Sequence, residues 1–244
     1  MKTPTTTDAI AFRRSQDALQ CDSVEPWQHG SVLRTPSVPN YWDVNAVRVE
    51  DADVSAAEML AAADRYLADC AHRKLDIEDE ATGAAAWPFF DAAGWLTERH
   101  TMMGRVGPPP PVRHDVLEVP LSATRDLRTE WYGEHADEAF MAAQEPVLAR
   151  RGMRAFMAGE DGYVMLATGP GAVEIDALYV TERARGTGLG ASLVAAALVA
   201  GGQDAAWIVA DDEGLARPLY ERLGFVTAWR YHDFVLGVAS RATL

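Results

Sequence analysis

The 244-residue sequence predicts an α/β fold, and three observations support it. An alternating apolar segment, residues 173–180 (VEIDALYV), leads through a short polar turn into a glycine-rich loop, residues 185–190 (RGTGLG). An apolar run typical of a helix follows at once, at residues 191–200. A second apolar segment, residues 205–210 (AAWIVA), has the composition of a buried strand. Hydrophobic residues make up 48% of the chain, which is enough for a packed core.

The first half of the chain predicts a shorter set of elements. Residues 42–49 (WDVNAVRV) predict a strand and residues 55–70 a helix. Four consecutive prolines, residues 108–111, favour an extended and semi-rigid segment. We therefore expect two domains, residues 1–107 and 115–244, joined by a proline-rich linker at 108–114.

The second half predicts the elements of a complete α/β domain. The expected elements are a strand at 116–119, a helical stretch at 121–151, strands at 155–158 and 163–167 joined by the turn 159–162, and, beyond the glycine-rich loop, strands at 205–210 and 227–237. Gly201 and Gly202 are expected to end the helix that follows the loop.

The two halves resemble each other in sequence. Residues 88–97 (PFFDAAGWLT) parallel residues 218–227 (PLYERLGFVT), and residues 42–49 parallel residues 173–180, in the same order and at similar spacing. Chance similarity between α/β segments is the alternative, and the preserved order and spacing argue against it. The copies differ at two positions that matter for chemistry. The first has DVSAAE, without glycine, where the second has its loop, and it has Phe90 where the second has Tyr220.

The glycine-rich loop predicts a seat for a pyrophosphate. Glycines at a strand-to-helix turn allow backbone N–H groups to point inward, and the helix N-terminus adds a partial positive charge. A P-loop is excluded because the loop contains no lysine. A dinucleotide-binding loop is harder to dismiss, because Gly186, Gly188 and Ala191 fit the G-x-G-x-x-G/A pattern. However, residues 181–184 separate this loop from its strand, and too little chain follows for a βαβαβ unit. The third interpretation is coenzyme A.

Two motifs resemble those of a known family. Arg185, Gly188 and Gly190 resemble the Arg-x-x-Gly-x-Gly pyrophosphate loop of the GCN5-related N-acetyltransferases (the GNAT family), and residues 216–225 (ARPLYERLGF) resemble the A-x-x-L-Y-x-x-x-G-F signature near the end of GNAT domains. The resemblance implies a GNAT-type mixed central sheet flanked by helices. The complete C-terminal domain would then follow a truncated, degenerate GNAT-like domain that binds no cofactor and covers the acceptor site or supports the active domain.

The resemblance also implies an activity and its site residues. The expected activity is transfer of an acetyl group from acetyl-CoA, as co-substrate, to an amine that we expect to be a small molecule. The residues expected to bind the cofactor are Leu178, Tyr179 and Val180 at the pantetheine arm and Arg185, Gly186, Thr187, Gly188, Leu189 and Gly190 at the pyrophosphate. Tyr220 is the candidate general acid and Glu174 the candidate general base, with Asp176 as the alternative base.

Two other segments are interpreted from the same resemblance. Residues 129–135 (TEWYGEH) follow the first strand of the domain, where the family forms the wall of the acceptor site, so their aromatic and acidic side chains suit a cation. Glu213 stands where many family members have an asparagine that contacts the cofactor arm. A CoA-binding sensor or interaction protein without turnover therefore stays open as an alternative function.

Composition excludes several other classes of function. The formal net charge of −14 argues against a nucleic-acid partner and suits a cationic amine. The two cysteines and six histidines show no metal-ligand spacing, so no metal site is expected. The N-terminal residues lack the apolar region of a secretion signal, and no apolar run has membrane-spanning length. We therefore expect a cytoplasmic protein without a membrane partner. A homodimer stays open.

Overall fold

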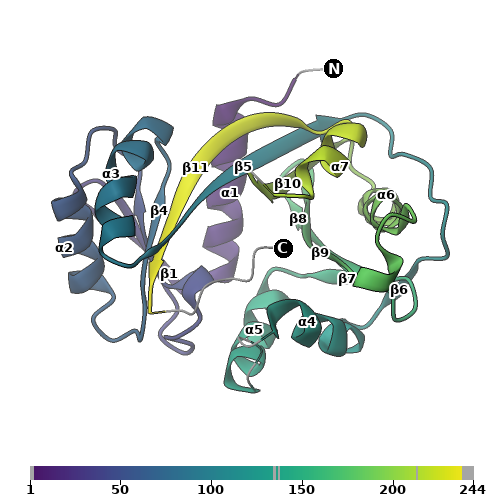
Figure 1. Cartoon of the computed structure of the whole chain (residues 1–244), viewed down its shortest axis with the longest axis horizontal. Helices are drawn as coiled ribbons and strands as arrows, with labels where there is room; N and C mark the ends of the chain where they lie inside the picture. Colours follow the sequence, from purple (N-terminus) through teal and green to yellow (C-terminus); the bar gives the residue numbers. More distant parts are fainter. Residues whose placement is uncertain (1–2, 134–135, 137, 213, 238–244) are drawn as a thin grey trace.

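The computed structural model describes residues 3–133, 136, 138–212 and 214–237. Within these residues, eleven strands form one continuous mixed sheet in the order β1-β2-β3-β4-β11-β5-β10-β9-β8-β7-β6, with helices packed against it (Figure 1). The predicted α/β fold, a mixed sheet flanked by helices, is confirmed.

The strands are β1 (Ser23–Trp27), β2 (Gly30–Arg34), β3 (Ala46–Val49), β4 (Arg73–Ile77), β5 (Leu96–Val106), β6 (Leu117–Val119), β7 (Arg154–Met157), β8 (Gly162–Gly169), β9 (Ala172–Val180), β10 (Ala205–Asp211) and β11 (Val226–Leu236). The helices are α1 (Thr6–Gln20), α2 (Ala56–Tyr66), α3 (Glu80–Ala92), α4 (Arg125–Tyr132), α5 (Glu138–Arg150), α6 (Leu189–Gly201) and α7 (Arg217–Arg222), with short 3₁₀ helices at Trp42–Val44, Leu121–Thr124 and Glu182–Ala184.

The predicted elements of the second half are found close to their expected bounds, whereas one prediction in the first half is wrong in part. Only Ala46–Val49 of the expected strand 42–49 is extended, because Trp42–Val44 forms a 3₁₀ turn. The Asn45 side chain fixes that turn, since its amide nitrogen donates to the carbonyls of Val38 (2.9 Å) and Tyr41 (3.0 Å). Helix α1 and the hairpin β1–β2 were not predicted.

The two halves exchange their last strands. Strand β5, from the first half, lies between β10 and β11, and β11, from the second half, lies between β4 and β5 (Figure 1). The two exchanged strands pair antiparallel with each other, with His100 opposite Tyr231 near the middle of the ladder. Each exchanged strand therefore completes the sheet of the other half.

The order of elements supports the internal repeat. Strands β3 and β4 are parallel and connected through α2, and strands β9 and β10 are parallel and connected through α6. In both halves a helix then precedes the exchanged strand, α3 before β5 and α7 before β11. Residues 108–114 contain neither helix nor strand. The division into two domains there stays a prediction, since the sheet runs without a break through both halves.

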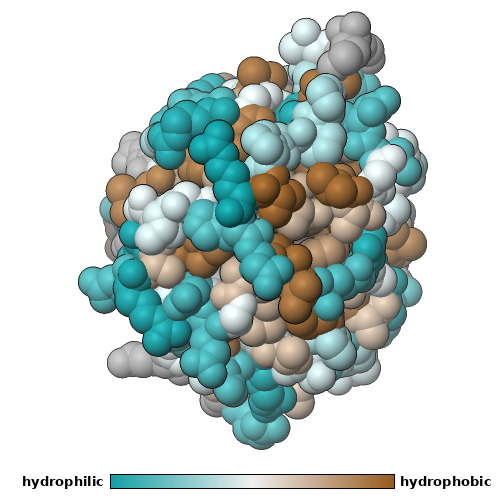
Figure 2. Space-filling view, turned by 90° about the vertical axis from the view of Figure 1, so that its right-hand side faces the viewer, coloured by the Kyte–Doolittle hydropathy of each residue, from teal (hydrophilic) through white to brown (hydrophobic). Residues whose placement is uncertain are grey.

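Apolar packing differs between the two faces of the sheet. On one face, α6 and α7 cover a core that includes Val173, Ile175 and Leu193. On the other, α1 crosses the middle of the sheet and places Phe12 against Trp207, with ring centroids 6.1 Å apart. Figure 2 views the end of the molecule that carries α6 and shows apolar side chains gathered around a hollow. No helix within the described residues is long and apolar enough to cross a membrane.

Candidate active site

A cavity of about 1230 Å³ lies between the two halves. Its wall includes Glu174, Asp176 and Tyr220 from the second half and residues of α1, β4 and β5 from the first. The candidate acid and both candidate bases therefore share one cavity, and the first half forms part of its wall. Among the described residues, no group of three or more His, Cys, Asp or Glu is placed to hold a metal ion.

Strand β9 separates from β10 at this cavity. The parallel pairing covers only Val173–Ile175 of β9, so residues 176–180 leave a gap beside β10. A bulge lies at the same place, because the β8–β9 register shifts between the pair Tyr163–Tyr179 and the pair Met165–Asp176. Ala177 has φ +46°, which is uncommon for a residue other than glycine. The bulge turns β9 away from its neighbour and opens a slot next to Asp176.

The backbone of Val180 faces this slot. The N–H of Thr181 donates to the carbonyl of Asp161 (2.9 Å), so the N–H and C=O of the preceding residue point to the opposite side of the strand, away from β8. The Val180 carbonyl accepts there from Nε of Arg185 (3.3 Å). Leu178 lies in the bulge and lines the cavity. Tyr179 also lines the cavity, and its hydroxyl donates to Glu130 (2.8 Å); burial raises the pKa of this hydroxyl to about 12.

The glycine-rich loop leads directly into α6. Gly186 (φ +77°) and Gly188 (φ +87°) have left-handed backbones, and Gly188 is the N-cap residue of the helix, with no side chain capping it. Thr187 closes the turn, since its hydroxyl donates to the carbonyl of Ala184 (2.8 Å). The first N–H groups of α6 therefore stay open for an anion, as a pyrophosphate seat requires.

In the first half, side chains cap the N-terminus of the equivalent helix, α2, and close it to an anion. Ser55 and Glu58 form a reciprocal capping box at the N-terminus of α2. Phe90, which stands where the second half has Tyr220, packs against Trp95 with ring centroids 4.8 Å apart. The first half thus lacks both the open helix end and the hydroxyl.

Tyr220 lies on α7, where its ring packs against Phe225 (6.2 Å between centroids). The side chain is buried at the cavity wall, and burial, together with the negative charge of Asp176, raises its pKa well above the usual value for tyrosine. The phenol therefore stays protonated at neutral pH and suits a proton donor.

Glu174 and Asp176 are joined by an arginine that sequence reasoning missed. Arg151 donates from Nη2 to Oε2 of Glu174 (2.7 Å) and from Nη1 to Oδ2 of Asp176 (2.9 Å). Burial raises the pKa of Glu174, and the charge of Asp176 adds to this, whereas Arg151 partly offsets it. No motif marks Arg151, which lies 23 residues before Glu174 at the end of a helix.

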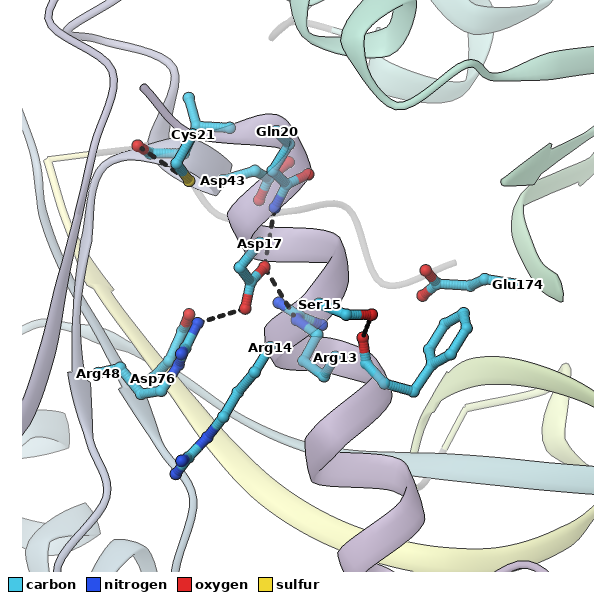
Figure 3. A network of polar contacts seen from close by, with 12 residues as sticks. Arg13, Arg14, Ser15, Asp17, Gln20, Cys21, Asp43, Arg48, Asp76 and Glu174 are labelled. Atoms are coloured by element: carbon cyan, nitrogen blue, oxygen red, sulfur yellow. Dashed lines mark hydrogen bonds and ion pairs between the residues drawn. The ribbon is translucent and has the colours of Figure 1, made fainter. Parts of the chain in front are cut away.

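Helix α1 forms a polar wall opposite β9. Figure 3 shows Glu174 pointing toward this helix, which carries Arg13 and Asp17. Arg13 donates to the Tyr231 hydroxyl (3.1 Å) and lies 3.5 Å from Asp17, which also pairs with Arg48. These α1 residues were not predicted either, because their place at the cavity follows from tertiary packing.

Two segments singled out in the sequence are described only in part. In residues 129–135, Trp131 lines the cavity and Glu130 accepts from Tyr179, while Glu134 and His135 lie outside the described residues. Glu213 also lies outside the described residues.

Comparison with known proteins supports the interpretation of the second half. The model of the acetyltransferase (GNAT) family matches residues 121–225. The curated proteins contain no match. A GCN5-related N-acetyltransferase from Kribbella flavida is 15% identical, with a TM-score of 0.63 and 98% of each chain covered. A conserved protein of unknown function from Staphylococcus epidermidis is 14% identical, with a TM-score of 0.72, covering 91% of this chain and 96% of its own.

A third structure, a GCN5-related N-acetyltransferase from Sphaerobacter thermophilus, has a TM-score of 0.56 at 14% identity, with 96% of this chain and 94% of its own chain covered. At these identities the structures show the fold, and they share it over both halves of the chain. The family model and the open glycine loop agree on the second half. Residues 121–225 are therefore a domain of the acetyltransferase (GNAT) family.

Proposed function

We propose that the protein is an acetyl-CoA-dependent N-acetyltransferase that transfers the acetyl group directly to a small-molecule amine. The observation that carries the proposal is the slot between β9 and β10, which lies between the open N-terminus of α6 and the carboxylates of Glu174 and Asp176. Acetyl-CoA bound in this slot would have its phosphates at the N-terminus of α6 and its acyl group in the cavity.

The chain supplies a residue for each step of the transfer. Backbone groups of Arg185–Gly190 hold the pyrophosphate, and the exposed edge of Leu178–Val180 holds the pantetheine arm and polarises the thioester carbonyl. The amine nitrogen attacks the carbonyl carbon, the C–N bond forms and the C–S bond breaks. Glu174 accepts the proton that nitrogen loses, and Tyr220 donates its hydroxyl proton to the departing thiolate. Acetyl-CoA supplies the activated acyl group.

The wall of the cavity supports a small cationic acceptor. Among the described residues that line it, seven are acidic and five are arginine or lysine. Aromatic side chains, including Trp131, lie between them. The first half covers this side of the sheet, so the acceptor enters a space enclosed by both halves.

Thiol release from acetyl-CoA across a panel of amines tests the proposal, with CoA binding measured by calorimetry beside it. We expect micromolar to millimolar KM values for at least one amine, the usual range for enzymes. Tight CoA binding without turnover of any amine would indicate a sensor. Binding of NAD(H) in place of CoA would instead favour a dinucleotide site.

A further inference from the structure

Arg151 holds two carboxylates that lie on one face of β9. Its backbone N–H continues the last turn of α5 by donating to the carbonyl of Val147 (3.1 Å), so the helix end places the side chain. Glu174 and Asp176 are two residues apart on the strand, so they point to the same side. The planar guanidinium donates to one oxygen of each carboxylate, Oε2 of Glu174 and Oδ2 of Asp176. The other oxygen of each carboxylate makes no hydrogen bond to Arg151.

The two carboxylates differ in depth. The Glu174 side chain is 8% exposed and the Asp176 side chain 35% exposed. Asp176 also comes directly before the bulge at Ala177, beside the slot between β9 and β10. An acceptor entering the cavity therefore meets Asp176 first and Glu174 behind it.

The charges that line the cavity favour a bound cation. Arg151 offsets one of the two carboxylates, while Arg13 and Arg48 share Asp17, and Arg48 also lies near Glu50 and Glu78. The hydroxyls of Tyr41, Tyr163 and Tyr220 also lie within electrostatic reach of Asp176, and each stays protonated because burial raises its pKa. Among the described residues that line the cavity, acidic side chains outnumber arginine and lysine by seven to five, and a bound ammonium would reduce this excess of negative charge.

We propose, on the basis of the proposed function, that Asp176 binds the acceptor as a protonated aliphatic amine and that Arg151 is a positioning residue. Arg151 sets the distance between the anchor, Asp176, and the base, Glu174. The ammonium contacts the open oxygen of Asp176, transfers one proton to Glu174 and attacks as the free amine. The nitrogen loses its second proton as the C–N bond forms, and that proton replaces the one that Tyr220 gives to the departing thiolate. Aromatic amines are neutral at neutral pH, so they form no ion pair with Asp176 and are poor acceptors.

Kinetics of four full-length variants test the proposal, with the best amine of the panel as acceptor. We expect Asp176→Asn to raise the KM for the amine about 10- to 100-fold, the scale of a lost hydrogen bond to a charged group, with kcat within about threefold of the wild type. Glu174→Gln lowers kcat instead. Arg151→Met changes both parameters, and Arg151→Lys restores them only in part, because an ammonium lacks the fork that reaches two carboxylates.

Arg150→Met is the matched control. Arg150 lies next to Arg151 but pairs with Asp22, so its loss should leave both kinetic parameters unchanged. CoA affinity should stay constant in all of these variants. Calorimetry of amine binding to the CoA complex in buffers of different ionisation enthalpy adds a readout without turnover. An amine that is protonated in solution and binds in that form releases no proton to the buffer at neutral pH.

The outcomes are separable. A fall in kcat at constant KM in Asp176→Asn would make Asp176 the base and overturn the assignment, as would release of one proton on amine binding. Wild-type kinetics in Arg151→Met would overturn the positioning role. Absence of turnover in the wild type would refute the proposed function itself.

Discussion

Gly188→Asp tests the seat of the pyrophosphate, with Gly188→Asn as its matched control. The backbone at Gly188 has φ +87°, and a Cβ there would meet only the Cε1 atom of His114, at 3.8 Å. Both variants therefore fit sterically and differ in charge. Each places a side chain in the left-handed region, which costs roughly 1–2 kcal/mol for most residues and less for Asn and Asp. Their free energies of unfolding should fall by similar small amounts.

The effect on CoA affinity follows from the charge. A carboxylate about 5 Å from a phosphate charge costs roughly 1–3 kcal/mol at effective dielectric constants between those of water and a protein surface. This corresponds to a loss of about 5- to 150-fold in CoA affinity for Gly188→Asp. Gly188→Asn should bind CoA close to the wild-type affinity, and isothermal titration calorimetry measures both.

Two results would refute this reasoning. Equal losses in the Asp and Asn variants would show that backbone conformation, and not charge, limits binding. Unchanged CoA affinity in Gly188→Asp, at low as well as physiological ionic strength, would place the pyrophosphate away from this loop.

Three further predictions follow from other parts of the molecule. Tyr220→Phe should lower kcat by roughly 10- to 1000-fold without changing CoA affinity, because only the donor is lost; wild-type turnover would contradict its role as the acid. One CoA should bind per chain by calorimetry, because the capping box closes α2; a stoichiometry of two, with one site in residues 1–107, would overturn this. His232 has a pKa lowered to about 4, chiefly by burial, so the unfolded chain takes up its proton first as the pH falls. The free energy of unfolding, from urea titrations, should therefore decrease between about pH 6.5 and 4, and His232→Gln should flatten that dependence; parallel curves would count against it.

Local chemistry explains which parts of the fold and site could be predicted. The alternation in residues 173–180 and the glycines at 186 and 188 are short-range signals, and they located β9 and the N-terminus of α6. The bulge at Ala177 carried no such signal, because alanine does not favour a positive φ and the register of two strands imposes it.

Contacts between distant segments explain what was missed. Arg151 reaches Glu174 only because α5 ends above β9, and Arg13 reaches the cavity only because α1 crosses the sheet. The exchange of β5 and β11 is invisible in the sequence for the same reason. Both strands have ordinary apolar patterns, and their neighbours are chosen by the packing of the whole sheet.

The exchanged strands β5 and β11 should hold the two halves together even when the chain between them is cut. A protease that cut between residues 108 and 114 would not release two bodies, because β11 stays hydrogen-bonded to β4 and β5 to β10. The two fragments would remain interlocked, as subunits do when they trade their terminal segments. Expressing either piece by itself would leave a vacant groove in its sheet and an unpaired strand beside it, the two features that drive association. The linker tethers the halves, and the traded strands hold them together.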